Sequence, residues 1–328
     1  MLALSVLDLS PIPKGSTPAD SFRNSLDLAQ HAERWGYRRY WLAEHHNMLG
    51  IASAATSVVI GHIAGGTKTI RVGSGGIMLP NHSPLVIAEQ FGTLESLYPG
   101  RIDLGVGRAP GTDQTTVRAL RRDPGSAEHF PQDVMELRAL LGTPVPHQLV
   151  VAVPGSNTNV PIWILGSSLF GAQLAGMLGL PYAFASHFAP EALMQALEVY
   201  RSHFRPSEQL DKPYVMVGMN VVAAETDAEA KRLFTSAQQG FTNLLRGTRG
   251  QLSPPIDDID SYWSPAEKAQ ASRMLRYAMV GDAATIREGI AQFAKDTKAD
   301  EFMATGMIYD HAARLTSYEI LSEVARTF

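Results

Sequence analysis

Three consecutive ionisable residues, Glu44, His45 and His46, follow directly on an apolar run of the chain. A carboxylate beside imidazoles can bind a metal ion, and an imidazole alone can give or take a proton near neutral pH. Adjacent side chains on an extended backbone point to opposite sides, so one ion rarely binds both histidines. No HxH, HExxH or DxH spacing supports a metal. We therefore predict no metal site, one histidine that faces a pocket and a second that is structural.

Polar or glycine-rich residues also stand at the ends of four other apolar runs, namely Ser74-Gly75-Gly76, Arg108, Ser167-Ser168, and His311 with Arg314. Arg108 fits a phosphate by its charge and its fork of donors, or it is a surface arginine paired with Asp103 or Asp113. Serines before a helix either cap it or, with the helix dipole, favour an anion. The two features together favour a phosphate.

The stretch GVGRAPG (105–111) has the appearance of a nucleotide-binding glycine motif. The third glycine is displaced, however, and Pro110 stands where a helix would begin. What remains is a glycine-rich strand end that a ligand can approach closely, with Arg108 beside it.

Composition narrows the class of protein. The chain has 328 residues, a formal net charge of −4 and no cysteine. A net charge of −4 gives no indication of binding to nucleic acid or to an anionic membrane. The absence of cysteine excludes disulfides, thiolate catalysis and iron–sulfur clusters. The N-terminus lacks the features of a signal peptide, and no apolar run approaches about 18 residues. We expect a soluble protein, in keeping with a reducing cytoplasm.

Eight short apolar runs alternate with segments of helical period. The expected strands are 2–9, 38–43, 70–76, 101–107, 161–166, 182–186, 214–224 and 301–308. The expected helices are 20–36, 52–66, 84–97, 127–142, 169–179, 191–204, 227–245 and 313–327. The alternation predicts an α/β fold, a single (β/α)8 barrel over 1–328, with its chemistry at the carboxyl ends of the strands. All five polar clusters, including His311 with Arg314, should therefore converge on one rim. A doubly wound sheet is the rival fold, but it rarely needs eight alternations.

Two segments interrupt this alternation. Residues 143–161 are long and proline-rich for a loop between a helix and a strand. Residues 246–282 form an insertion before the last helix and strand of the barrel. Such an insertion is either a lid over the active face or a structural excursion that packs on the outer helices, and we weigh the two equally.

Four stretches resemble the bacterial luciferase-like, flavin-dependent monooxygenases: YWLAEHHN (40–47), the run VGSGG to GVGRAPGTD (72–113), WILGSS (163–168) and VGDAATIREGIAQF (280–293). The chain is most similar to a single-component branch of uncharacterised oxidoreductases that share the pattern DHAARLTSYEIL (310–321). The resemblance covers nearly the whole chain. It implies a (β/α)8 barrel that binds FMN, or reduced FMN supplied by a separate flavin reductase.

The resemblance also implies roles for single residues. The family's histidine after the second strand corresponds to His45, which in relatives supports the flavin hydroperoxide, and Glu44 is expected to orient that turn. The family's phosphate-binding groups correspond to Arg108, Ser167, Ser168 and Gly171. The family has a non-prolyl cis peptide beneath the flavin ring, at the position of Gly75–Gly76. Together with Ser74 and with Leu9, at the end of the first strand, this segment is expected to line the cofactor site.

Two positions depart from luciferase. Where luciferase has a second phosphate-binding arginine, this chain offers His129 or Phe130, so FMN affinity is expected to be low or to depend mainly on Arg108. Gly107 replaces the reactive cysteine near the flavin. Neither light emission nor a long-chain aldehyde substrate is therefore implied.

The resemblance thus implies a monooxygenase in which His45 stabilises the flavin hydroperoxide. One oxygen atom would then pass to a small organic substrate held near Leu9, Met78 and His82. Deazaflavin-dependent hydride transfer, flavin binding without turnover and, more remotely, a metal-dependent barrel hydrolase are the alternatives. We expect no nucleic-acid or membrane partner. We expect a cytoplasmic homodimer that pairs through the helices after the second and third strands, although these helices could equally pack only on the barrel.

Overall fold

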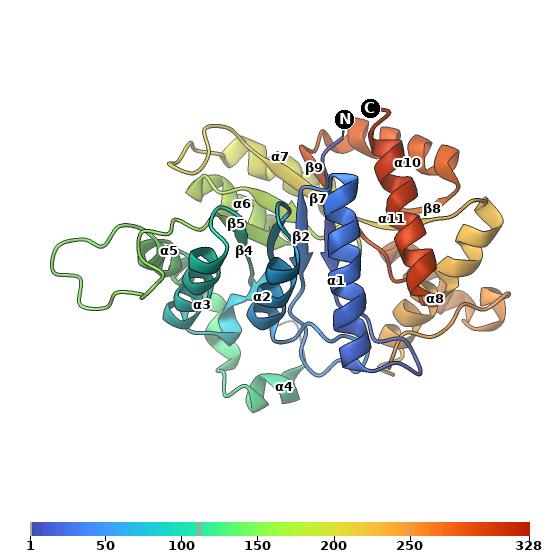
Figure 1. Cartoon of the computed structure of the whole chain (residues 1–328), viewed down its shortest axis with the longest axis horizontal. Helices are drawn as coiled ribbons and strands as arrows, with labels where there is room; N and C mark the ends of the chain where they lie inside the picture. Colours follow the sequence, from blue (N-terminus) through green and yellow to red (C-terminus); the bar gives the residue numbers. More distant parts are fainter. Residues whose placement is uncertain (1, 110–112, 249) are drawn as a thin grey trace.

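The computed structural model describes residues 2–109, 113–248 and 250–328, and its centre is a closed barrel of parallel strands (Figure 1). The barrel strands are β1 (Leu4–Asp8), β2 (Arg39–Leu42), β3 (Arg71–Met78), β4 (Ile102–Gly107), β5 (Ile162–Gly166), β6 (Tyr182–Phe184), β7 (Val215–Ala223) and β9 (Glu301–Thr305). Successive strands pair from β1 to β7, and β9 pairs with both β7 and β1, which closes the ring. The predicted (β/α)8 barrel is confirmed.

A layer of helices covers the outside of the barrel (Figure 1). The longer helices are α1 (Pro18–Trp35), α2 (Thr56–Gly66), α3 (Pro84–Leu97), α5 (Phe130–Leu141), α6 (Leu169–Leu178), α7 (Leu193–His203), α8 (Asp227–Leu245), α10 (Ala283–Thr297) and α11 (His311–Ala325). Local sequence sets their ends. Helix α1 begins at a capping box between Thr17 and Asp20, and it ends at Gly36, whose φ of 88° is a conformation that glycine adopts without strain.

Side chains of the strands alternate between the inside of the barrel and the helical layer. Leu7, Trp41 and Trp163 belong to the apolar cluster inside the barrel, where the two indole rings meet edge to face. Their neighbours along the strands, such as Val6 and Tyr40, belong to the large core between barrel and helices. The inner cluster fills the barrel, so a ligand can bind only at its ends.

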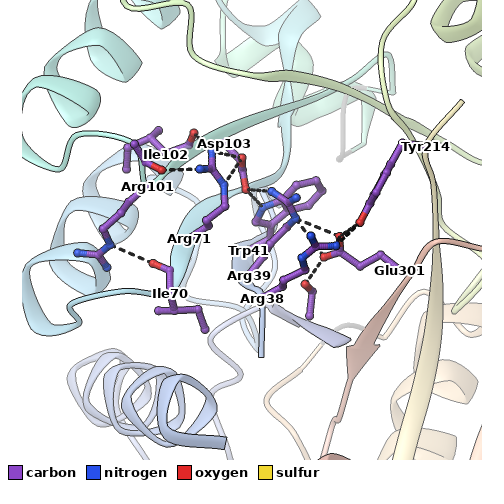
Figure 2. A network of polar contacts seen from close by, with 12 residues as sticks. Arg38, Arg39, Trp41, Ile70, Arg71, Arg101, Ile102, Asp103, Tyr214 and Glu301 are labelled. Atoms are coloured by element: carbon purple, nitrogen blue, oxygen red, sulfur yellow. Dashed lines mark hydrogen bonds and ion pairs between the residues drawn. The ribbon is translucent and has the colours of Figure 1, made fainter. Parts of the chain in front are cut away.

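Charged residues close the amino-terminal end of the barrel (Figure 2). Arg39 donates to Asp103 at 2.7 Å and to Glu301 at 3.0 Å, and Arg71 donates to Asp103 at 2.6 Å. The side chains of Asp103 and Glu301 are fully buried. Trp41 Nε1 also donates to Asp103 at 3.1 Å, so this carboxylate is well satisfied. This closed floor leaves the carboxyl ends of the strands as the place for chemistry.

The insertion 246–282 has secondary structure of its own. It contains the short helical turn η3 (Ile259–Ser261), helix α9 (Pro265–Met274) and strand β8 (Ala278–Gly281). Strand β8 pairs in parallel with β7 outside the ring, so the sheet has one strand more than we predicted. A role of this insertion as a lid stays a prediction. Residues 143–161 lie in no helix and are irregular up to β5, and this segment reaches away from the body of the protein (Figure 1, left).

Candidate active site

Glu44 is the centre of a hydrogen-bond network directly after β2. Its carboxylate accepts hydrogen bonds from the Met78 N–H at 2.9 Å and from Asn81 Nδ2 at 3.1 Å. The Nε2 atoms of His46 and His82 lie 2.7 and 2.9 Å from the same carboxylate. His82, which we expected near the substrate, therefore points its Nε2 atom at Glu44.

The protonation of Glu44 follows from these contacts. Burial alone would raise its pKa, but the hydrogen bonds from His46 and His82 and from the Met78 N–H outweigh burial and lower the pKa to about 2. Glu44 is therefore a carboxylate at neutral pH that ties the turn after β2 to the segment after β3. His46 is the structural member of the histidine pair, which leaves His45 as the candidate for chemistry.

His187 lies close to His45, beyond the end of β6. Its ring packs against Gly218 of β7, and its carbonyl oxygen accepts a hydrogen bond from Asn220. Its Nδ1 atom is buried without a hydrogen-bond partner among the described residues. Burial, and then the charge that His45 can carry, lower the pKa of His187 to about 4. His187 is therefore a neutral imidazole at pH 7.

His187 was not among the residues predicted from the sequence. It follows the apolar run 182–186 just as His45 follows 38–43, so the rule that polar residues collect at strand ends would have found it. The signal was weaker because a single histidine stands there, followed by a phenylalanine.

The peptide bond between Gly75 and Gly76 is cis, as the resemblance implied. A Cβ atom on Gly75 would come within 2.7 Å of Leu7, and one on Gly76 within 2.9 Å of the Gly105 carbonyl oxygen. Gly76 therefore has room only for glycine, because the clash is with backbone, whereas a side chain at Gly75 would require Leu7 to move. Ser74 is fully buried and donates its hydroxyl to Gly105 at 2.8 Å, so it fastens β3 to β4 beneath this peptide.

Leu9 follows β1 and is partly buried against the inner apolar cluster of the barrel. Its carbonyl oxygen accepts a hydrogen bond from Ser53 at 3.1 Å. Leu9 therefore offers an apolar surface at the carboxyl end of the barrel.

Arg108 extends from the end of β4 and stacks on Phe170, in the first turn of α6, with its guanidinium carbon 4.5 Å from the ring centre. The acidic partners that we considered for it have other roles. Asp103 belongs to the barrel floor, and Asp113 caps the short helix α4 (Gln114–Ala119). Pro110 and Gly111, from the same glycine-rich stretch, lie outside the described residues.

Ser168 is the N-cap residue of α6, but its side chain makes no capping hydrogen bond. The simple capping role that we considered for this serine is therefore not realised, and the hydroxyl can meet a ligand. Ser167 precedes it and is half-buried. Gly171 is buried in the first turn of α6, where a Cβ atom would approach Tyr182 only to an ordinary 3.7 Å. Arg108 and the amino-terminal end of α6 thus form a region that suits an anion.

The prediction that His311 and Arg314 join these residues is wrong. His311 Nε2 lies 2.8 Å from Asp27 of α1, and the buried guanidinium of Arg314 lies 2.7 Å from Asp8. Both residues belong to α11, which packs on α1 outside the barrel. Their position after the last strand was identified correctly, but their side chains turn away from the mouth, which is the carboxyl end of the barrel.

Neither a metal cluster nor a membrane span emerges from residues 2–109, 113–248 and 250–328. No group of three metal-ligating side chains there is placed to hold an ion. No helix in this part of the chain has both the length and the apolar composition to cross a bilayer.

Comparison with known proteins identifies the family. The model of the luciferase-like monooxygenase family matches residues 3–301. The chain belongs to this family. A luciferase-like monooxygenase of Escherichia coli (strain K12) is 57% identical over 324 residues, which are 98% of this chain and 97% of the relative. The solved structure of apo-MsnO8 is 36% identical, with a TM-score of 0.92 over 100% of this chain and 99% of that one.

Two solved structures of much lower identity share the fold and differ in the cofactor that their descriptions name. The oxygenating constituent of 3,6-diketocamphane monooxygenase from Pseudomonas putida, solved with FMN, has a TM-score of 0.76 at 17% identity over 100% of this chain and 98% of its own. An F420-dependent secondary alcohol dehydrogenase has a TM-score of 0.73 at 16% identity over 99% of both chains. At these identities the likeness concerns the fold alone.

Proposed function

We propose that this chain is a monooxygenase that uses reduced FMN and molecular oxygen to oxidise a small organic substrate. One observation carries the proposal: Arg108 stacks over the first turn of α6, beside the N-cap Ser168, whose side chain makes no capping bond. A guanidinium next to a helix N-terminus is a phosphate site by charge and by geometry. FMN carries such a phosphate, and it is the ligand of the Pseudomonas putida relative.

The residues present fit the rest of this cofactor. Gly75 and Gly76 present bare backbone, and a Cβ atom added to either would clash with its neighbours. Leu9 adds an apolar surface at the mouth. Arg108, Ser167 and Ser168 would hold the phosphate of FMN, whereas the glycines and Leu9 would hold its ring. Ser74 would support that segment from below through its bond to Gly105.

When bound, reduced FMN supplies the electrons with which oxygen is activated. His45 is the residue of this chain that would hold or give a proton next to the reacting atoms. Glu44 would act as a positioning residue, because its hydrogen bonds to His46 and Met78 fix the turn that carries His45. The apolar cluster around Trp41 would keep water from the site.

We further propose that a separate flavin reductase delivers reduced FMN and that the chain works as a cytoplasmic homodimer. Val58 on α2 is 71% exposed and Leu97 on α3 is 63% exposed. Large apolar side chains exposed on these two helices favour a contact there, although the same helices also pack on the barrel.

Substitution of His45 tests the proposal. The reduced protein–FMN complex of His45→Ala should react with oxygen at least about tenfold more slowly, or release more of the oxygen as hydrogen peroxide. His203→Ala, which removes an exposed histidine at the end of α7, is the matched control and should behave as the wild type. The measurement is stopped-flow absorbance together with a peroxide assay. Identical kinetics and peroxide yield in His45→Ala and the wild type would remove His45 from the mechanism.

A further inference from the structure

A cavity of about 150 Å³ lies between the loop after β2, the second half of α8 and residues 250–253. Most of its lining is apolar, including Met48, Leu49, Ile51, Phe241, Leu252 and Met307. Among the residues that the structure describes, none that lines the cavity is charged. Two of its polar side chains are already engaged, since Asn243 accepts a hydrogen bond from Tyr262 and Gln251 donates one to Ser16.

The cavity adjoins the candidate active site along the chain. Met48 belongs to the turn that begins at Glu44 and His45, and Met307 follows the end of β9 by two residues. Backbone hydrogen bonds tie these walls together. Ile12 N–H donates to Gly50 at 2.9 Å, and Leu252 N–H donates to Ile12 at 2.9 Å. These hydrogen bonds hold the walls of the cavity in place at the carboxyl end of the barrel.

The size and lining of the cavity define the group that fits it. A dry apolar cavity of about 150 Å³ is large enough for benzene. The cavity is partly open to solvent, since Leu49 of its lining is 69% exposed, and its described lining offers a charged group no ion pair in place of lost hydration. On the basis of the proposed function, we propose that this cavity binds an uncharged, apolar part of the substrate, no larger than about one benzene ring. The substrate class is therefore a molecule that carries a short, uncharged alkyl or aryl group.

Gly240 of α8 gives direct access to this cavity. It lines the cavity, and a Cβ atom on it would meet nothing within 4 Å. Gly240 is exposed at the edge of the cavity, so a leucine at this position places a side chain over its open side without a clash at the Cβ atom. It also favours the helix, because glycine is about 1 kcal/mol less favourable than alanine in a helix interior. Gly240→Ala is the matched control, since it makes the same backbone change and leaves most of the volume empty.

The test is a ¹⁹F NMR titration of the full chain with fluorobenzene, with and without oxidised FMN. We expect binding to the wild type, binding within threefold of it in Gly240→Ala, and at least tenfold weaker binding in Gly240→Leu. Circular dichroism checks that both variants are folded. We also expect fluorobenzene and FMN to bind together, because substrate and cofactor must occupy the site at the same time.

Each other outcome overturns one of the two proposals. Failure of fluorobenzene to bind the wild type, equal binding to Gly240→Leu, or competition with FMN would overturn the proposal for the cavity and leave the proposed function standing. Normal fluorobenzene binding without any binding of oxidised FMN or, in an anaerobic repeat of the titration, of reduced FMN would overturn the proposed function instead.

Discussion

The imidazole of His187 lies directly against the backbone of Gly218, where an added methyl group would collide with the ring's Nδ1. The missing side chain of Gly218 is what leaves room for the ring of His187. In that position burial is the main cause that lowers the pKa of His187 to about 4. The mouth of the barrel thus holds a second imidazole that stays neutral across the physiological pH range.

Gly218→Ala should displace the ring of His187 from this position. Because burial is the main cause of the low pKa, the pKa of His187 should rise from about 4 toward the ordinary 6.5. NMR of the imidazole nitrogens over pH 3 to 8 measures it, with the signal assigned by its loss in His187→Gln. Gly166→Ala is the control, since a Cβ atom there meets nothing within 4 Å. An unchanged titration in Gly218→Ala would show that packing on Gly218 does not bury the ring.

Glu44→Gln should reduce the stability of the protein at pH 7 more than at acid pH. The pKa of Glu44 is about 2 in the folded state against an ordinary 4.5, so its stabilisation is complete above 4.5. It is lost as the pH falls from 4.5 to 2, and we expect a loss of roughly 3 kcal/mol at most. Urea unfolding at pH 7 and at pH 3.5 measures the difference. The exposed Glu191→Gln is the control. An equal effect of Glu44→Gln at both pH values would contradict the assignment.

Asp103→Ala should destabilise the barrel without changing the mouth. It leaves Arg39 and Arg71 without the carboxylate that both contact, and removal of one partner from a buried ion pair costs about 3–5 kcal/mol. Thermal unfolding measures the loss, and the exposed Asp211→Ala should unfold as the wild type. The affinity of the folded fraction for FMN should stay the same. A stable Asp103→Ala protein with weakened FMN binding would mean that the charged residues at the amino-terminal end of the barrel influence FMN affinity.

Arg108→Ala should weaken FMN binding by about 10- to 100-fold, because a hydrogen bond to a charged group contributes about 1.5–3 kcal/mol. Riboflavin lacks the phosphate, so its affinity should hardly change. Flavin fluorescence titration compares the two ligands, and Arg108→Lys should recover part of the FMN affinity, since lysine keeps the charge and loses the fork. If Arg108→Ala weakened FMN and riboflavin equally, the residue would act on the ring and not on the phosphate.

Much of the fold could be predicted from the alternation of apolar runs. Each of the eight predicted ranges overlaps a barrel strand, and all but 70–76, which ends two residues before β3 does, contain the whole strand. Parallel strands that are buried on both faces are almost continuously apolar, which makes them recognisable. Strand β8, Ala278–Gly281, was missed, since it is four residues long and has only two buried positions. Helix α4 was missed as well, and Val117 is its one buried residue.

The site was partly predictable for a physical reason. Strand ends identify which residues lie at the carboxyl end of the barrel, and they correctly single out Glu44, Arg108 and the Gly75–Gly76 segment. They do not determine where a side chain points. Arg314 turns to Asp8, because both belong to the layer between barrel and helices. That direction depends on packing that brings together residues more than 300 positions apart in the sequence.

The central claim, that the chain uses reduced FMN, is tested most directly by an anaerobic titration. Absorbance is recorded while the purified protein is titrated with oxidised and then with reduced FMN, after which oxygen is admitted. We predict tighter binding of the reduced form and a transient near-ultraviolet band once oxygen enters. Binding of neither form, with binding of a deazaflavin in its place, would contradict the account.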